Sequence, residues 1–84
     1  LAQLYDLNVY PNPTTGQLTV EADFGKTING RLGIRNVLGQ TVISENLNAS
    51  SMRKTFDLST LENGIYMVII ETENGVATRR ITKQ

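Results

Sequence analysis

Residues 64–83 read GIYMVIIETENGVATRRITK and carry the clearest folding signal of the chain. Gly64 to Glu73 is rich in β-branched and aromatic side chains, which favour strands. The pair Asn74-Gly75 follows, and it is preferred in two-residue type I′ turns because both turn positions take positive φ angles. The stretch therefore predicts a β-hairpin whose two strands meet at Asn74 and Gly75.

A two-residue loop at Asn74-Gly75 sets the register of this hairpin by pairing Glu73 with Val76. Counting outward on one face predicts the pairs Thr72 with Ala77, Ile70 with Arg79, Val68 with Ile81, and Tyr66 with Lys83. This face is the candidate for the core, although it also carries Arg79. Either Arg79 extends its charged end to the rim of the sheet, or the loop is one residue longer. The opposite face leaves Met67 and Ile69 beside Arg80.

Working outward, the composition extends the strand prediction to the whole chain. Ten Thr, seven Ile and six Val stand against four Ala in 84 residues, and this mix fits pleated strands better than helices. Further strands are expected at Leu7 to Tyr10, Gln17 to Ala22, Arg31 to Asn36, Thr41 to Asn46 and Lys54 to Asp57. Turns are expected at residues 11–16, Asn29-Gly30, 37–40 and 58–61, and Leu47 to Arg53 reads as a loop.

About seven short antiparallel strands follow from this division. One seven-stranded sheet would leave an apolar face in water, so we expect two sheets packed face to face. The predicted fold is therefore all-β, an immunoglobulin-like β-sandwich.

The residue inventory excludes most catalytic chemistry. The chain has no Cys and no His, the side chain that most often serves as a general base or metal ligand. The carboxylates are spread singly, unlike the alternating oxygen ligands of a calcium loop. Eight basic and eight acidic side chains balance to zero net charge, which argues against binding nucleic acid or an anionic membrane through bulk charge. We expect no catalytic residue, no cofactor, no metal, no nucleic-acid partner and no direct membrane insertion.

Three of the eight basic residues, Arg79, Arg80 and Lys83, fall within the last six positions. Charges on a terminal strand discourage aggregation between sheet edges, and charge alone favours this interpretation. The other interpretation is a tail that a partner recognises.

Four motifs, in this order, resemble those of the type IX secretion system C-terminal sorting domain, type A. They are NVYPNPTTG at 8–16, NVLGQ at 36–40, LENGIY at 61–66 with Val68 and Ile70, and RRITKQ at 79–84. Their combination and spacing are specific. Thr82 stands where an aliphatic residue is more usual in such tails, and Arg79 and Arg80 stand where lysines are common.

The resemblance implies a seven-stranded sandwich at residues 8–84, preceded at residues 1–7 by the end of a linker from an upstream cargo domain. It implies an address that the outer-membrane translocon and its shuttle components read. A cell-surface sortase would then remove the domain and often join the cargo to anionic lipopolysaccharide. The protein would cross the periplasm and finish in the outer membrane, at the cell surface or secreted.

On this basis the residues expected to contact the translocon lie in the final hairpin and the tail. They are Tyr66, Met67, Ile69, Arg79, Arg80, Ile81, Lys83 and Gln84. An exposed strand edge there would suit β-augmentation, and it would also allow two copies to dimerise. Turn architecture is the first interpretation of Pro11, Asn12, Pro13, Gly16, Gly39, Gly64, Asn74 and Gly75, because such residues set backbone angles whether or not a ligand binds.

The alternative function is an accessory adhesion or carbohydrate-binding sandwich that stays on the mature protein. Such modules usually expose aromatic rings that stack on sugars. The aromatic residues here are Tyr5, Tyr10, Phe24, Phe56 and Tyr66, and several occupy expected core or turn positions. A purely structural spacer is a third possibility.

Overall fold

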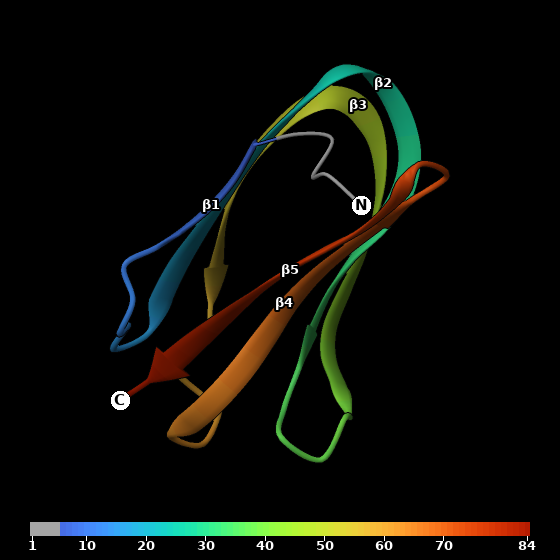
Figure 1. Cartoon of the computed structure of the whole chain (residues 1–84). Coiled ribbons are helices and arrows are strands. Elements are labelled where there is room, and N and C mark those ends of the chain that lie inside the picture. Colours follow the sequence, from blue (N-terminus) through green and yellow to red (C-terminus); the bar gives the residue numbers. More distant parts are fainter. Residues whose placement is uncertain (1–5) are drawn as a thin grey trace.

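The computed structural model describes residues 6–84, and within that range every regular element is a β-strand (Figure 1). The strands are β1 (Asp6–Tyr10), β2 (Gln17–Arg35), β3 (Thr41–Asp57), β4 (Gly64–Thr72) and β5 (Gly75–Lys83). The prediction of an all-β fold is confirmed. No helix of the described part of the chain is long and apolar enough to span a membrane. Residues 1–5 of the expected linker lie outside the described residues, while Asp6 and Leu7 belong to β1.

All five strands join one antiparallel sheet. The first half of β2 pairs with β1, its second half pairs with β4, and β3 follows β2 along both halves. Figure 1 shows β2 and β3 arching together, so that the half containing β1 faces the half containing β4 and β5. The expected two sheets of about seven strands are therefore corrected to five strands in one curled sheet, whose two halves supply the facing layers.

A β-bulge lets β2 turn the corner without ending. Residues 24–27 of β2 lie opposite the single β3 residue Ser50, and such an insertion bends a strand. Within the bulge Gly25 has a φ of 76°, and its amide donates to Asp23 Oδ1 at 3.0 Å. The turn expected at Asn29-Gly30 is wrong because both residues continue the ladder, where Gly30 pairs with Leu47 and Thr72.

The loop expected at Leu47 to Arg53 is also wrong, because these residues form the middle of β3. Leu47, Ala49 and Met52 are half-buried, whereas the residues between them are exposed. The alternation shifts by one position at residues 50–51, beside the bulge of β2. Small polar side chains and this shift hid the strand pattern in the sequence.

The final hairpin forms, but its loop begins one residue earlier than expected. Thr72 pairs with Gly75, which leaves Glu73-Asn74 as the two-residue loop. The turn is not type I′, because no non-glycine residue of the described chain has a positive φ. The Asn74 amide donates to the Thr72 hydroxyl at 3.0 Å, and this side-chain bond favours a turn that starts at Thr72.

Each cross-strand pair of the hairpin is consequently shifted by two residues. Tyr66 lies opposite Ile81, and Val68 lies opposite Arg79. An even shift keeps every side chain on its own face, so the predicted core face is confirmed. The loop is not longer, and Arg79 is half-buried on this face with its Nη1 donating to the Thr78 carbonyl at 2.8 Å.

The core lies between the two halves of the curled sheet. Its buried apolar side chains are Leu7, Leu18, Val20, Ala22, Phe24, Ile28, Leu32, Ile34, Phe56, Leu58, Tyr66, Val68, Ile70, Ala77 and Ile81. Every core residue of β2 has an even number, so the same alternation of buried and exposed side chains continues from the first half of the strand to the second. Across the bend of β3, Lys54 forms an ion pair with Glu45 and lies 5.7 Å from the centre of the Phe56 ring.

Two glycines of β2 offer a matched test of this packing. A Cβ atom on Gly30 would lie 2.1 Å from the Glu71 carbonyl oxygen, whereas one on Gly33 would have only the Ile43 carbonyl oxygen nearby, at 3.9 Å. We expect Gly30→Ala to lower the free energy of unfolding by about 1–3 kcal/mol, because the backbone at Glu71 must move to make room for the new methyl group. Gly33→Ala should leave it unchanged or raise it by up to about 1 kcal/mol. Urea unfolding measures both, and equal effects would contradict the close contact at Gly30.

Candidate functional site

The C-terminal strand β5 is held along the whole of one edge and, at residues 80–84, along the other edge as well. One edge pairs with β4, and the other meets the segment that follows β1 (Figure 1). In that segment the Asn12 side chain donates from Nδ2 to the Arg80 carbonyl at 3.1 Å and accepts at Oδ1 from the Thr82 amide at 3.0 Å. Pro11 and Pro13 have no amide hydrogens, so the Asn12 amide group supplies a donor and acceptor that a strand backbone would otherwise provide.

Thr14 continues the same contact through its backbone. Its amide donates to the Thr82 carbonyl at 2.9 Å, and its carbonyl accepts from the Gln84 amide at 2.8 Å, which makes a parallel bridge to Lys83. The Thr14 side chain is buried, and its hydroxyl donates to the Gln17 carbonyl at 2.5 Å and accepts from the Gly16 amide at 3.1 Å. We call the contacts between residues 12–14 and residues 80–84 the tail clasp.

Lys83 extends the tail clasp to a third motif. Only 7% of Lys83 is exposed, and its Nζ donates to Asn63 Oδ1 at 3.1 Å. Nearby, the hydroxyl of the buried Tyr66 donates to the Glu62 carbonyl at 2.6 Å. The turn before β4 is thereby tied both to the last residues of the chain and to the core.

The remaining motif, residues 36–40, forms a turn that hydrogen bonds to Asn36 hold in place. Asn36 Oδ1 accepts from the amides of Leu38 and Gln40, each at 3.0 Å, and its carbonyl accepts from the Gly39 amide at 3.0 Å. Gly39 has a φ of 83°, which a Cβ would strain. The turn presents two aliphatic side chains to solvent, since Val37 is 75% and Leu38 81% exposed. Across from it, residues 60–66 form the other wall of a groove of about 410 Å³.

All four motifs thus gather at one end of the molecule. Figure 1 shows residue 84, the segment between β1 and β2, and the turns before β3 and β4 at this end. The Leu58 amide donates to the Gly16 carbonyl at 2.7 Å, which joins two of these loops. In the same corner, hydrogen bonds from the Ser59 hydroxyl and then the Ser59 amide hold the pKa of the Asp57 carboxyl below its usual value. The bulge, the β4–β5 turn and the start of β1 lie at the opposite end.

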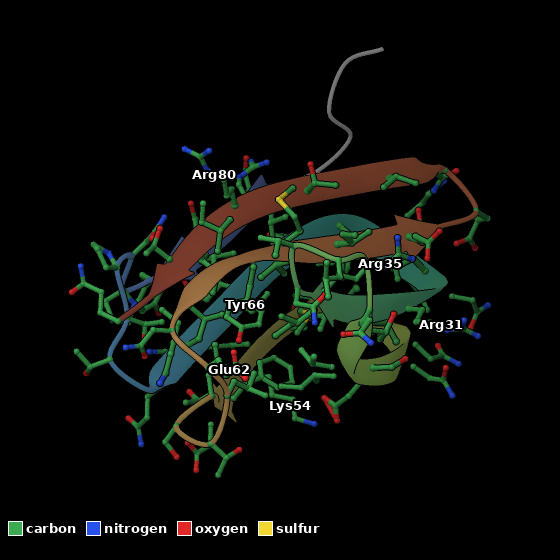
Figure 2. The ribbon with its side chains drawn as sticks, turned by 90° about the horizontal axis from the view of Figure 1, so that it is seen from below. Arg31, Arg35, Lys54, Glu62, Tyr66 and Arg80 are labelled. Carbon is green, nitrogen blue, oxygen red and sulfur yellow. The ribbon has the colours of Figure 1, made fainter. Side chains whose placement is uncertain are left out.

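Burial divides the residues that the sequence predicts for translocon contact. Tyr66, Ile81 and Lys83 are buried, Met67, Ile69 and Arg79 are half-buried, and Arg80 and Gln84 are exposed. Figure 2 shows Arg80 extending away from the body of the molecule, while Tyr66 lies within it. The structure places this set on β4, on β5 and at Gln84 directly after β5, and its role in recognition stays a prediction.

The expected turn residues lie where the chain changes direction. Pro11, Asn12, Pro13 and Gly16 lie between β1 and β2, Gly39 before β3, Gly64 at the start of β4, and Asn74 and Gly75 at the last turn. Sequence reasoning did not single out Thr14 and Asn63, which hold the tail. Both lie beside predicted turn residues, but no local pattern shows that a buried Thr in a loop will bind a strand near the other end of the chain.

Two further features of residues 6–84 concern metal binding and the addition of a partner strand at the edge of β5. No three acidic side chains in this range come together as ligands for a metal ion. The outer edge of β5 is occupied by the tail clasp from Arg80 to Gln84. The long open edge belongs to β3, which pairs only with β2 among the described strands.

The tail clasp can be tested by removing the Asn12 amide group. We expect Asn12→Ala to lower the free energy of unfolding by about 1–3 kcal/mol, because the Thr82 amide and the Arg80 carbonyl lose their partner. The matched control is Asn48→Ala on the exposed side of β3, which should stay within about 0.5 kcal/mol of wild type. Hydrogen exchange adds a local measurement, and unchanged protection of the Thr82 amide in Asn12→Ala would contradict the bond.

Comparison with known families agrees with the four motifs. A family model described as the secretion system C-terminal sorting domain matches residues 8–84. No curated protein and no solved structure was found to match. The matched range includes every residue of the tail clasp. Members of this family are sorting signals and not enzymes, and they act with the secretion machinery to export a cargo protein across the outer membrane. The chain therefore belongs to the C-terminal sorting domains of type IX secretion.

Proposed function

We propose that the translocon reads this domain as a folded address, at the end of the molecule where the four motifs meet. The observation that carries the proposal is the tail clasp, because it makes residues 80–84 part of the fold. A tail that is already ordered loses less conformational entropy when a partner binds it. The clasp thus supports recognition of a preformed surface over recognition of an extended peptide.

Within that surface, the accessible side chains make the direct contacts. Arg80 and Gln84 are exposed, and Met67 and Ile69 lie half-buried on the face of β4 that points away from the core. Tyr66, Ile81 and Lys83 support these residues from the buried side. The rigid turn with Val37 and Leu38 adds exposed aliphatic side chains, a feature that often marks an interaction site.

We propose further that a sortase removes the domain after the cargo has crossed the periplasm and the outer membrane. The cut would fall in the predicted linker, before β1 begins at Asp6. In support, β1 begins at the end of the molecule opposite the motifs (Figure 1). Recognition and cleavage would then use separate ends of the domain, and the cargo would finish secreted or attached to lipopolysaccharide.

A reporter protein fused ahead of residue 1 tests recognition in secreting cells. Deletion of Lys83 and Gln84 removes the bonds to Asn63 and Thr14, and we expect it to reduce surface delivery at least about tenfold. Gln84→Ala keeps the backbone amide that binds Thr14 and removes only the exposed side chain, so a smaller loss of delivery with this variant would assign most of the effect to the clasp. Normal delivery by the truncated chain would contradict the proposal.

Charge reversal at an exposed position tests the surface itself. Arg80→Glu should reduce delivery, whereas Lys26→Glu, an identical charge change in the bulge at the opposite end, should not. Circular dichroism of the purified chains confirms that both remain folded. Equal delivery by the two variants would argue against recognition at the motif end.

Mass spectrometry of the mature cargo distinguishes removal from retention. Loss of residues 8–84 is the expected result, and their retention would favour the adhesion or carbohydrate-binding module. Among the aromatic residues that the structure describes, Phe24, Phe56 and Tyr66 are buried and Tyr10 is 38% exposed. This part of the chain therefore offers a sugar ring little aromatic surface on which to stack.

A further inference from the structure

A row of three side chains crosses the outer face of the sheet near the motif end. Arg35 of β2 pairs with Met67 of β4, and Met67 pairs with Arg80 of β5. Directly paired residues share a face, and this face points away from the core because Ile34, Val68 and Ile81 point inward. A half-buried thioether therefore lies between two exposed guanidinium groups. No pattern in the sequence links Arg35 to the predicted recognition residues.

Ile69 enlarges the apolar centre of this face. It lies two residues along β4 from Met67 and pairs with Gly33 on one side and Thr78 on the other. Gly33 has no side chain and Thr78 has a small one, so Met67 and Ile69 form a low apolar strip. Val76, on the same face, is 63% exposed.

The charges around this strip are unbalanced, although the chain as a whole is neutral. Beyond Ile69 on the same face, Arg31 of β2 pairs with Glu71 of β4. The face of β2, β4 and β5 therefore carries three arginines, Arg31, Arg35 and Arg80, and one carboxylate. Within residues 6–84 the guanidinium groups of Arg35 and Arg80 form no ion pair. They are therefore available to an external anion.

We propose that this face, defined by Arg35, Met67, Ile69 and Arg80, docks an acidic protein surface of the secretion machinery, and this inference rests on the proposed function. Arg35 and Arg80 bind two carboxylates, because a guanidinium matches the planar carboxylate with two parallel hydrogen bonds. Adjacent strands lie about 5 Å apart, so the two arginines start about 10 Å apart, one on each side of the strip. An apolar side chain of the partner packs between them on Met67, whose flexible thioether adapts to its shape.

The composition of the face favours a protein surface over a lipid surface. Segments that bind anionic lipid usually gather roughly 4–8 Lys or Arg residues. Here three arginines share the face with Glu71 and surround an apolar strip. Charge around an apolar centre is the arrangement of a protein interface.

Arg35 provides the sharpest test, because it lies outside the tail and the tail clasp. With the reporter fused ahead of residue 1, we expect Arg35→Glu to reduce surface delivery at least about tenfold, because like charges would meet in the interface. Arg35→Lys keeps the positive charge but loses the paired hydrogen bonds, so its delivery should lie between those of Arg35→Glu and wild type, and Lys26→Glu is the control for charge reversal. If urea unfolding shows that Arg35→Glu is less stable than wild type, Arg35→Gln carries the test with the same expected direction. Normal delivery by the stable variant would overturn the docking face.

Deletion of residues 8–84 separates failure of this inference from failure of the proposed function. If the deletion stops delivery while Arg35→Glu does not, the address function stands and the docking face is wrong. If the deletion leaves delivery unchanged, the proposed function itself is wrong.

Crosslinking in secreting cells tests the chemistry of the partner. A photoreactive amino acid at position 69 should crosslink to a protein segment that contains at least two carboxylates, and Arg35→Glu should abolish this crosslink. A crosslinked segment without carboxylates would overturn the proposal. Vesicles of phosphatidylcholine and phosphatidylglycerol test the lipid alternative with the purified chain. Binding to them that Arg35→Glu abolishes would assign the face to lipid instead.

Discussion

The unbroken burial of alternate side chains along β2 holds this domain together. Leu18 and Val20 before the bulge, and Leu32 and Ile34 after it, are all completely buried. β1, β3 and β4 each pair with β2, so this strand belongs to both facing halves of the sheet. The bulge with Gly25 changes its direction without changing which side chains face the core. A small domain with no disulfide can therefore close its core with a single sheet.

The curl of the sheet explains how four short motifs from distant parts of the chain form one end of the domain. It places the segment after β1 beside β5, where Asn12 and Thr14 bind the backbone from Arg80 to Gln84. Lys83 is buried there and bound to Asn63, so one of the three basic tail residues serves the fold. Arg80 remains exposed and joins Arg35 and Met67 in a row across three strands. The basic tail thus has a structural part and an accessible part.

Local patterns predicted much of the fold. The strand at Gln17 to Ala22, the core face of the final hairpin and the turn at residues 37–40 agree with the structure. The predicted register of the hairpin differs from the structure, because the Thr72 hydroxyl favours a turn that starts one residue before the expected one. Residues 47–53 were missed because small polar side chains and the shift at 50–51 weaken the strand pattern. Of the site, Arg80 and Met67 could be named from the sequence, whereas Thr14, Asn63 and Arg35 could not.

By itself, the sequence determined the all-β class, the core face of the final hairpin, the family, and the lack of the Cys and His residues on which most catalytic sites rely. Strand formation and facing are local properties, since they follow from propensity and from alternation along a few residues. Only the tertiary structure decided that seven expected strands join into five, that Lys83 is buried while Arg80 is exposed, and that Arg35 lies in line with Met67. Those outcomes depend on contacts such as the Asn12 bonds, which span 68 and 70 residues and exist only because the curled sheet brings its first and last strands together.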